Sequence, residues 1–406
     1  MTTDTQPAEP ASRLVAFVGA YGVDGDEQAG GITVLDVARD GRTLTPLGRS
    51  AEPREAGHLV YAPGTRTLYA VDERKNDGRG PVQPPAAVHA LAVGPDGGLT
   101  RVNALPAPGP RPTHLCLDEG RGVLLTANHG DFDHVEHVVR TADGGWDVEY
   151  LYDDSTVLLY GLRPDGALAG LRDVHVRTGH GPDPNTSPQA GGHAQSGAHA
   201  HSAVVDPSGR FVLVADKGTD RIDVLALGED TLTPVESHVF PPQTGPRHIA
   251  FAPTTGHAYV TCEFASTLAA FAFDAHTGRL TPLDEAPTVD KGHTGLNEPA
   301  EVRVHPDGGF VYVNNRGEDS LAWFRTDADG RLTRLGHVPL APSLHPGVAA
   351  RSFAFAPGGG FLLVADRPAN LVRAYAVDAE DGSLSALGTV DVAQPAYVEF
   401  AELPHE

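Results

Sequence analysis

The stretch HSAVVDPSGRFVLVADK, residues 201–217, decides the fold. It consists of an alternating apolar run, a tight turn over DPSG, and a second apolar run. Alternation is typical of half-buried strands, and a turn of Asp, Pro, Ser and Gly between two of them is typical of a β-hairpin. The stretch therefore predicts two antiparallel strands, which we name A and B.

The same phrase recurs along the chain, as HLVYAPGTRTLYAVDE, THLCLDEGRGVLLTANH, RHIAFAPTTGHAYVTCE, AEVRVHPDGGFVYVNNR and RSFAFAPGGGFLLVADR. A second phrase follows each copy, for example LALGEDTLTPV or FDAHTGRLTPL, and predicts two further strands, C and D. The later A–B turns fall near Asp206, Pro253, Pro306 and Pro357, at spacings of 47, 53 and 51 residues. Four-strand units at such a spacing are typical of the blades of a β-propeller.

The two ends of the chain complete the count of blades. RLVAFVGAYG matches a B strand but follows no A strand, whereas PAYVEFAE matches an A strand and precedes no B strand. Pairing of residues 395–402 with 13–20 would close a ring and leave no free sheet edge there. We therefore predict an all-β fold, a seven-bladed β-propeller of four-stranded antiparallel blades. Residues 13–406 form one domain in this prediction, and residues 1–12 form a disordered tail.

The composition narrows the classes of function. Thirty Lys and Arg stand against 53 Asp and Glu, a net charge of −23 with histidine neutral. Such a surface repels phosphate backbones, so neither nucleic acid nor an anionic membrane is an expected partner. The N-terminus lacks the apolar segment of a signal peptide, no run approaches the roughly 18 apolar residues of a membrane span, and two isolated cysteines make no disulfide framework. These features favour a cytoplasmic protein.

Charged residues gather where successive A strands begin and B strands end. Because antiparallel neighbours begin and end at the same edge, these positions share one mouth of the central channel. The residues at or just before the start of A include His114, His201, Arg247, His248, Glu301 and Arg351, and those at the end of B include Glu73, His129, Lys217, Glu263, Arg316 and Arg367. Five cations there predict an anionic ligand, since arginine binds carboxylate or phosphate through two donors.

The loop GGHAQSGAHAH, residues 191–201, adds histidines at this mouth. His199 and His201 with Glu263 could supply ligands to zinc, but two or three candidates on a Gly-rich loop are few, and we expect no metal. His201 is instead the expected general acid or base, because imidazole titrates near neutral pH. His193 is expected to be a solvated loop residue.

The insert DFDHVEHVVRTADGGWDVEYLYDD, residues 131–154, separates strands B and C of the third unit. Phe132, Val135, Val138 and Val139 have helical spacing, which predicts a short helix followed by a strand. Loops between B and C lie on the face of the mouth. The insert is therefore expected over the mouth, as a lid, a packing elaboration or an oligomer contact.

Several motifs resemble those of one known family. HAHSAVVDPSGRF, GPRHIAF, CEF at a B-strand end, PAEVRV and NNRGEDSLAWF look like the seven-bladed β-propeller lactonase family, over about residues 14–400. That family includes the bacterial propeller-type 6-phosphogluconolactonase and the fungal 3-carboxy-cis,cis-muconate lactonizing enzyme. The resemblance implies catalytic roles for His201, Arg247, Glu263 and Arg316. The chain departs from the family at Ser352, where a histidine is frequent, and in its two long loops, which favours a specialised substrate.

Residues and resemblance together predict an enzyme without cofactor or metal that hydrolyses a small anionic lactone. His201 would be the base or acid, Glu263 its partner or the alternative base, and Arg247 and Arg316 the anchors of a carboxylate or oxyanion. The expected substrate-binding residues are His199, His248, Glu301, Arg351, Lys217, Arg367, His114, His129 and Glu73. The alternatives are a cycloisomerase acting on an unsaturated acid and a non-catalytic propeller that binds a ligand or a protein. A concave pocket at the mouth would favour an enzyme, and a flat rim would favour the non-catalytic propeller.

Overall fold

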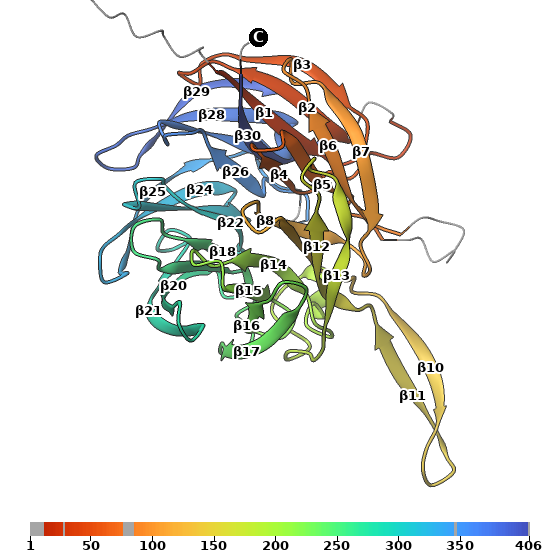
Figure 1. Cartoon of the computed structure of the whole chain (residues 1–406). Coiled ribbons are helices and arrows are strands. Elements are labelled where there is room, and N and C mark those ends of the chain that lie inside the picture. Colours follow the sequence, from red (N-terminus) through yellow and green to blue (C-terminus); the bar gives the residue numbers. More distant parts are fainter. Residues whose placement is uncertain (1–11, 27–28, 76–84, 345–346, 405–406) are drawn as a thin grey trace, which may run out of the picture.

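The seven-bladed architecture is confirmed. The computed structural model describes residues 12–26, 29–75, 85–344 and 347–404, and the predicted tail lies almost wholly outside them. Within these ranges the chain forms seven four-stranded antiparallel sheets that surround a central axis (Figure 1). The same ranges contain two short 3-10 helices, η2 (Gln189–Gly192) and η3 (Arg367–Ala369), and no α-helix.

The blades are numbered from the N-terminus, and each is given from its inner to its outer strand. Blade 1 contains β30 (Pro395–Leu403), β1 (Arg13–Ala20), β2 (Gly31–Val37) and β3 (Leu44–Ser50), blade 2 contains β4 (Leu59–Ala62), β5 (Thr67–Val71), β6 (Ala87–Val93) and β7 (Leu99–Pro106), and blade 3 contains β8 (Pro112–Asp118), β9 (Val123–Asn128), β12 (Ser155–Leu162) and β13 (Leu168–Arg177).

The second half of the ring repeats the pattern without insertion. Blade 4 contains β14 (Ala200–Val205), β15 (Phe211–Asp216), β16 (Arg221–Leu227) and β17 (Leu232–Val239), blade 5 contains β18 (Pro246–Phe251), β19 (Ala258–Cys262), β20 (Thr267–Asp274) and β21 (Arg279–Pro287), blade 6 contains β22 (Glu298–Val304), β23 (Phe310–Arg316), β24 (Ser320–Thr326) and β25 (Leu332–Pro339), and blade 7 contains β26 (Ser352–Phe355), β27 (Phe361–Asp366), β28 (Leu371–Val377) and β29 (Leu384–Asp391).

The two ends of the chain close the ring in blade 1. Strand β30 pairs antiparallel with β1 from Arg13↔Leu403 to Ala20↔Pro395, with one irregularity at Gly19/Ala20. The predicted pairing of 395–402 with 13–20 is therefore confirmed. The innermost strands contact their neighbours in turn around the axis, so each A strand begins at the wall of the central channel.

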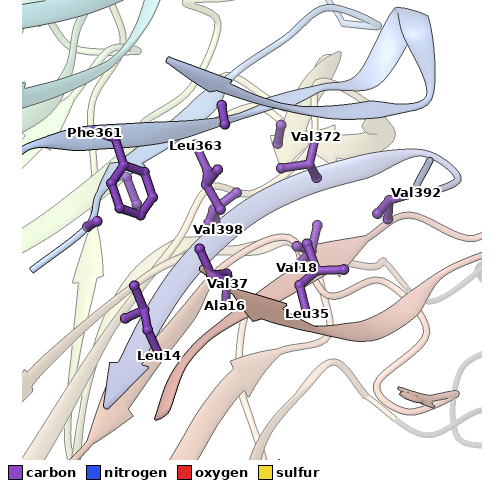
Figure 2. Close-up of a cluster of buried hydrophobic side chains, with 14 residues drawn as sticks. Leu14, Ala16, Val18, Leu35, Val37, Phe361, Leu363, Val372, Val392 and Val398 are labelled. Atoms are coloured by element: carbon purple, nitrogen blue, oxygen red, sulfur yellow. The ribbon is translucent and has the colours of Figure 1, made fainter. Parts of the chain in front are cut away.

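Apolar side chains fill the spaces between blades. Figure 2 shows the cluster between blades 7 and 1, where Leu363 of β27 and Val398 of β30 lie beside Val37 of β2. Each buried side chain of this size stabilises the fold by about 1.5–3 kcal/mol relative to its exposed form. Because these contacts hold the blade faces together, the strand ends at the channel mouth are left to polar residues.

The insert in blade 3 differs from its prediction. It is a β-hairpin, β10 (His134–Arg140) paired with β11 (Trp146–Tyr152), and the predicted short helix is wrong. The hairpin stands away from the ring (Figure 1), and side chains such as Val135 and Trp146 are 65% and 67% exposed. Valines with helical spacing are also β-branched, and such residues favour strands when a Gly-containing turn follows.

Candidate active site

A concave pocket opens at the predicted mouth. It has a volume of 610 Å³ and is lined by residues from several blades, among them His129, Phe132, Gln189 and His201. Seven lining residues are cationic, Arg74, Lys75, Arg111, Lys217, Arg316, Arg351 and Arg367, and two are acidic, Glu55 and Glu73. In a chain with a net charge of −23, the charged residues of this pocket are thus mostly cations, which attract an anionic ligand.

A carboxylate with no exposed surface lies beneath three of the mouth's cations. Lys217 Nζ lies 2.9 Å from Glu263 Oε1, while Arg247 Nε and Arg316 Nη2 each lie 2.9 Å from Glu263 Oε2. Gln189 Nε2 also donates to Glu263 Oε1 at 2.8 Å. Blades 4, 5 and 6 are therefore joined at their B-strand ends by one anion, which we call the Glu263 cluster.

The cations decide the protonation state of Glu263. Burial alone would raise the pKa of Glu263, but Lys217, Arg316 and Arg247 hold that pKa well below its usual range. Burial in turn lowers the pKa of Arg247 to about 9, with the neighbouring Arg316 acting in the same direction. Glu263 lines neither cavity of the mouth, so it is a counter-ion behind the pocket wall and a weak proton acceptor.

Six histidines of blades 2 to 5, five of them buried and His114 half-buried, form a second group beside the Glu263 cluster, which we call the histidine cluster. Successive ring centroids lie 4.5 Å apart for His58–His114, 5.5 Å for His114–His248, 5.0 Å for His248–His201, 5.5 Å for His201–His129 and 4.5 Å for His129–His199. Burial is the largest cause of a lowered pKa in all six. The cluster is therefore neutral at neutral pH.

His201 lies at the boundary between the pocket and a smaller inner cavity. The inner cavity has a volume of 20 Å³, enough for about one water, and shares Tyr21, Glu73, Thr113, His201 and Arg351 with the pocket. His201 Nδ1 lies 3.1 Å from His248 Nε2. Within the described residues, no hydrogen bond or ion pair joins His201 to Glu263.

The turn after β15 fixes the residues at the entrance of blade 4. The buried carboxylate of Asp216 accepts hydrogen bonds through Oδ1 from the backbone N–H groups of His199, Gly218 and Thr219, at 2.8, 3.0 and 3.2 Å. A Cβ atom at Gly218 would lie 2.1 Å from the carbonyl oxygen of Gly197, so only glycine fits between the turn and the histidine loop. Lys217 and His201 thus face one pocket from the two strands at the open end of one hairpin.

Two arginines of blade 7 share one aromatic ring at the rim. The guanidinium carbons of Arg351 and Arg367 lie 5.3 and 4.6 Å from the centroid of Tyr21. Arg351 also donates to the Tyr21 hydroxyl, which itself donates to Glu73 Oε2 at 2.6 Å. Burial and the charge of Arg351 lower the pKa of Arg367. The rim therefore holds two close positive charges that an anion would stabilise.

The structure brings all thirteen of the predicted site residues to this mouth. The pocket wall includes Glu73, His129, His201, Lys217, Arg316, Arg351 and Arg367, the inner cavity adds Arg247, His248 and Glu301, and His114, His199 and Glu263 pack behind these walls. His193 is exposed, as predicted. Among the described residues, the one group of three side chains with metal-ligand spacing is Asp290, Glu318 and His337, in which Arg334 pairs with both carboxylates.

Sequence reasoning missed several residues of the pocket wall. Arg74, Lys75 and Arg111 lie in loops outside the repeated phrases, and Gln189 lies in the irregular loop before blade 4. Phe132, at the base of the insert, stacks its edge on His129 with the centroids 5.3 Å apart. The closeness of Arg74, Lys75, Arg111 and Phe132 to predicted strand ends was the signal that could have placed them at the mouth.

The comparisons with known proteins agree with the propeller fold. The model of the family "Lactonase, 7-bladed beta-propeller" matches residues 15–400. The chain belongs to this lactonase family. Among relatives of this lactonase, a 6-phosphogluconolactonase of Bacillus subtilis is 27% identical over 392 residues, which cover 96% of this chain and 99% of the relative.

Solved structures give the same result. The periplasmic gluconolactonase PpgL of Pseudomonas aeruginosa superimposes with a TM-score of 0.80 at 26% identity, covering 97% of this lactonase and 100% of PpgL. A Lactobacillus plantarum protein gives 0.79 at 26% identity, covering 96% and 100%. No helix in the described part of the chain has the length and apolar character that crossing a membrane requires. The cytoplasmic location stays a prediction.

Proposed function

We propose that this lactonase hydrolyses a small lactone that carries a carboxylate or phosphate, without a cofactor or metal. The observation that carries the proposal is the pairing of a cation-lined pocket of 610 Å³ with a neutral histidine, His201, in its wall. The cations would bind the anionic group of the substrate, and a neutral imidazole is the form that accepts a proton. The family match and the names of the relatives support lactone hydrolysis.

The reaction assigned to this pocket has two proton transfers. His201 accepts a proton from a water molecule while the water oxygen attacks the lactone carbonyl carbon. Arg316 and Lys217, both in the pocket wall, stabilise the oxyanion that forms. The ring C–O bond then breaks, and the leaving alkoxide takes the proton back from His201. The product is the open hydroxy acid, and the enzyme returns to its starting state.

Glu263 has a different role from the one that the sequence favoured. With three cations at 2.9 Å and a depressed pKa, its carboxylate binds a proton poorly. We assign it to hold Lys217, Arg247 and Arg316 in position, and His201 to proton transfer. Arg351 and Arg367 are assigned to the second end of the substrate, at the rim.

The test is turnover of a panel of substrates by the purified chain. 6-Phosphoglucono-δ-lactone, glucono-δ-lactone and carboxylated butenolides would be followed by acid release, with the spontaneous rate subtracted. Carboxylated muconates would be followed by loss of diene absorbance. Acid release from an anionic lactone that survives exhaustive chelation supports the proposal. Ring closure of a muconate without lactone hydrolysis would replace it with a cycloisomerase, and no turnover would favour a binding protein.

A further inference from the structure

Three side chains form a line from the pocket into the inner cavity. His201 Nδ1 lies 3.1 Å from His248 Nε2, and His248 Nδ1 lies 3.4 Å from Glu301 Oε1. The three residues come from the inner strands of blades 4, 5 and 6, and each is at most 7% exposed. The starts of these three strands are neighbours around the axis. They therefore place two imidazoles and a carboxylate in a row.

The carboxylate fixes which nitrogen of each ring carries a proton. Burial would raise the pKa of Glu301, but Arg303 and His248 lower it to about 2, so Glu301 is ionised and can only accept. The contact of His248 Nδ1 with Glu301 at 3.4 Å is electrostatic, without the geometry of a hydrogen bond, and it favours the neutral tautomer with the proton on Nδ1 and an acceptor at Nε2. His201 must in turn donate to that acceptor from Nδ1. Its Nε2 is left with a free lone pair.

The surroundings do not offer His201 another arrangement. Within the described residues, His201 Nε2 has no hydrogen-bond partner, and His201 itself lines the pocket. The other charged or titratable groups around the line are Arg247 beside His248, Arg303 3.7 Å from Glu301, His114 and His58 on the inner strands of blades 3 and 2, Tyr397 and Glu399 of β30, and His129 and Lys217 beside His201. Tyr21, Glu73 and Arg351 also line the inner cavity. Besides burial, Arg247, His248, Lys217 and His129 oppose a positive charge on His201.

We propose that Glu301 and His248 are positioning residues for the reaction, which set the tautomer of His201 so that Nε2 faces the pocket as the base. The proposal rests on the proposed function for its kinetic consequence only. When His201 takes a proton from water, His248 accepts a hydrogen bond from the imidazolium, and the charge of Glu301 stabilises it through His248. Neither Glu301 nor His248 need touch the substrate.

The direct test is the tautomer of His201 in the free protein. Histidine labelled with ¹⁵N would be studied by multiple-bond ¹H–¹⁵N correlation near pH 7.5, with the His201 signals identified by their loss in His201→Gln. The expected result is a proton on Nδ1 in the wild type and on Nε2 in Glu301→Gln, whose amide can donate to His248 Nδ1 and reverse the line. A wild-type His201 protonated on Nε2 would overturn the proposal.

The kinetic test uses a matched pair of carboxylates in the same channel. Glu301→Gln should lower kcat by at least about 30-fold with KM within about 3-fold, a smaller loss than the roughly 10⁴-fold that follows when a carboxylate bonded directly to a catalytic histidine is made an amide. Glu399→Gln is the control, because Glu399 also lies near Arg303 but accepts from the backbone of Tyr61 and has no contact with His248. It should keep kcat within about 2-fold.

The pH profile separates positioning from a structural effect. Removing the charge of Glu301 lowers the pKa of His201, so the acid limb of kcat/KM should move to lower pH while the plateau falls. Equal losses in Glu301→Gln and Glu399→Gln, or a loss matched by a lower Tm, would contradict positioning. If no lactone is turned over but the tautomer switches as expected, the arrangement of His201, His248 and Glu301 is supported and the proposed function fails.

Discussion

The Glu263 cluster and the histidine cluster lie side by side in the same mouth, and yet they handle charge in opposite ways. Three cations surround one carboxylate in the first, so every member stays ionised. Neutral rings contact one another in the second, and burial lowers their pKa values. Fixed charge and mobile protons are thus separated within one pocket.

This separation indicates which groups bind charge and which groups transfer protons. A carboxylate held by three cations contributes a steady electrostatic field but does not exchange protons near neutral pH. A neutral imidazole contributes little field but can take up a proton during the reaction. The comparison therefore assigns binding to the arginines and lysine of blades 4 to 7, and proton transfer to His201.

Replacement of His201 should reduce activity more than any other change. His201→Gln should lower kcat/KM by about 10²–10⁴-fold, the range that a positioned acid or base supplies. Its Tm should change little, because glutamine keeps a polar side chain at the cavity wall and the apolar clusters between blades do not include His201. His193→Gln, in the same loop but exposed, is the control and should keep full activity. Retained activity in His201→Gln would end the assignment.

Replacement of Glu263 should lower the stability of the fold. Glu263→Gln removes the counter-ion that three buried cations share, although Arg316 keeps Glu298 at 3.5 Å, and the change should cost about 3–5 kcal/mol of unfolding free energy. The exposed pair Arg39–Glu402 offers a control, since Glu402→Gln should fall within about 0.5 kcal/mol. Urea denaturation of the three proteins measures both changes. Equal stability of Glu263→Gln and the wild type would show that the cluster is not a buried ion network.

Glu263 should also make the free energy of unfolding depend on pH. The pKa of Glu263 is lower in the folded chain than its ordinary value of 4.5, so its contribution to stability is present above pH 4.5 and is lost as the pH falls below it. The stability difference between the wild type and Glu263→Gln should therefore shrink between pH 4.5 and lower values. A difference that stays constant through this range would contradict the depressed pKa.

The arginines should show a smaller effect on catalysis than His201. Arg316→Lys keeps the charge but loses the planar pair of donors, so we expect a loss of about 2–4 kcal/mol of transition-state stabilisation, or roughly 30- to 1000-fold in kcat/KM. Arg334→Lys in the same blade, which pairs with Asp290 and Glu318 outside the pocket, is the control. Near-normal kcat/KM together with a lower Tm would make Arg316 a brace between blades.

The hairpin should matter least. Replacing residues 134–152 with two glycines is feasible because His134 and Tyr152 are cross-strand partners, so the cut ends lie close together. Phe132 stays in place, and kcat/KM should change by less than about 3-fold. A larger loss would restore the predicted role of the insert as a lid. Size-exclusion chromatography of the same variant would test the alternative of an oligomer contact.

The sequence predicted the blades because each unit repeats its own strand and turn pattern. The same repetition placed His201, Arg316 and Glu301 at one mouth, since their positions within the unit determine which strand end they occupy. It did not predict which side chains would touch across blades. The contact of His201 with His248, and not with Glu263, depends on the angle between neighbouring blades, which no single unit encodes.

The insert shows a second limit. Three valines fit both a helical face and a strand, and spacing alone could not separate the two. The cations Arg74, Lys75 and Arg111 lie in loops beside the predicted strand ends, and the repeat does not determine how far such loop side chains reach into the channel. Repeated elements are thus located from the sequence, whereas irregular loops are located by the packing around them.

In the proposed function, the cations of the mouth bind an anionic group of the substrate while His201 transfers the protons of lactone hydrolysis. The most direct measurement is kcat/KM for two lactones that differ only by the 6-phosphate group, 6-phosphoglucono-δ-lactone and glucono-δ-lactone, followed by acid release at low and high salt. A hydrogen-bonded charge in this pocket should favour the phosphorylated lactone by about 1.5–3 kcal/mol, or roughly 10- to 150-fold, and salt should reduce that preference. Equal kcat/KM values for the two lactones, unchanged by salt, would contradict the binding of an anionic group by these cations.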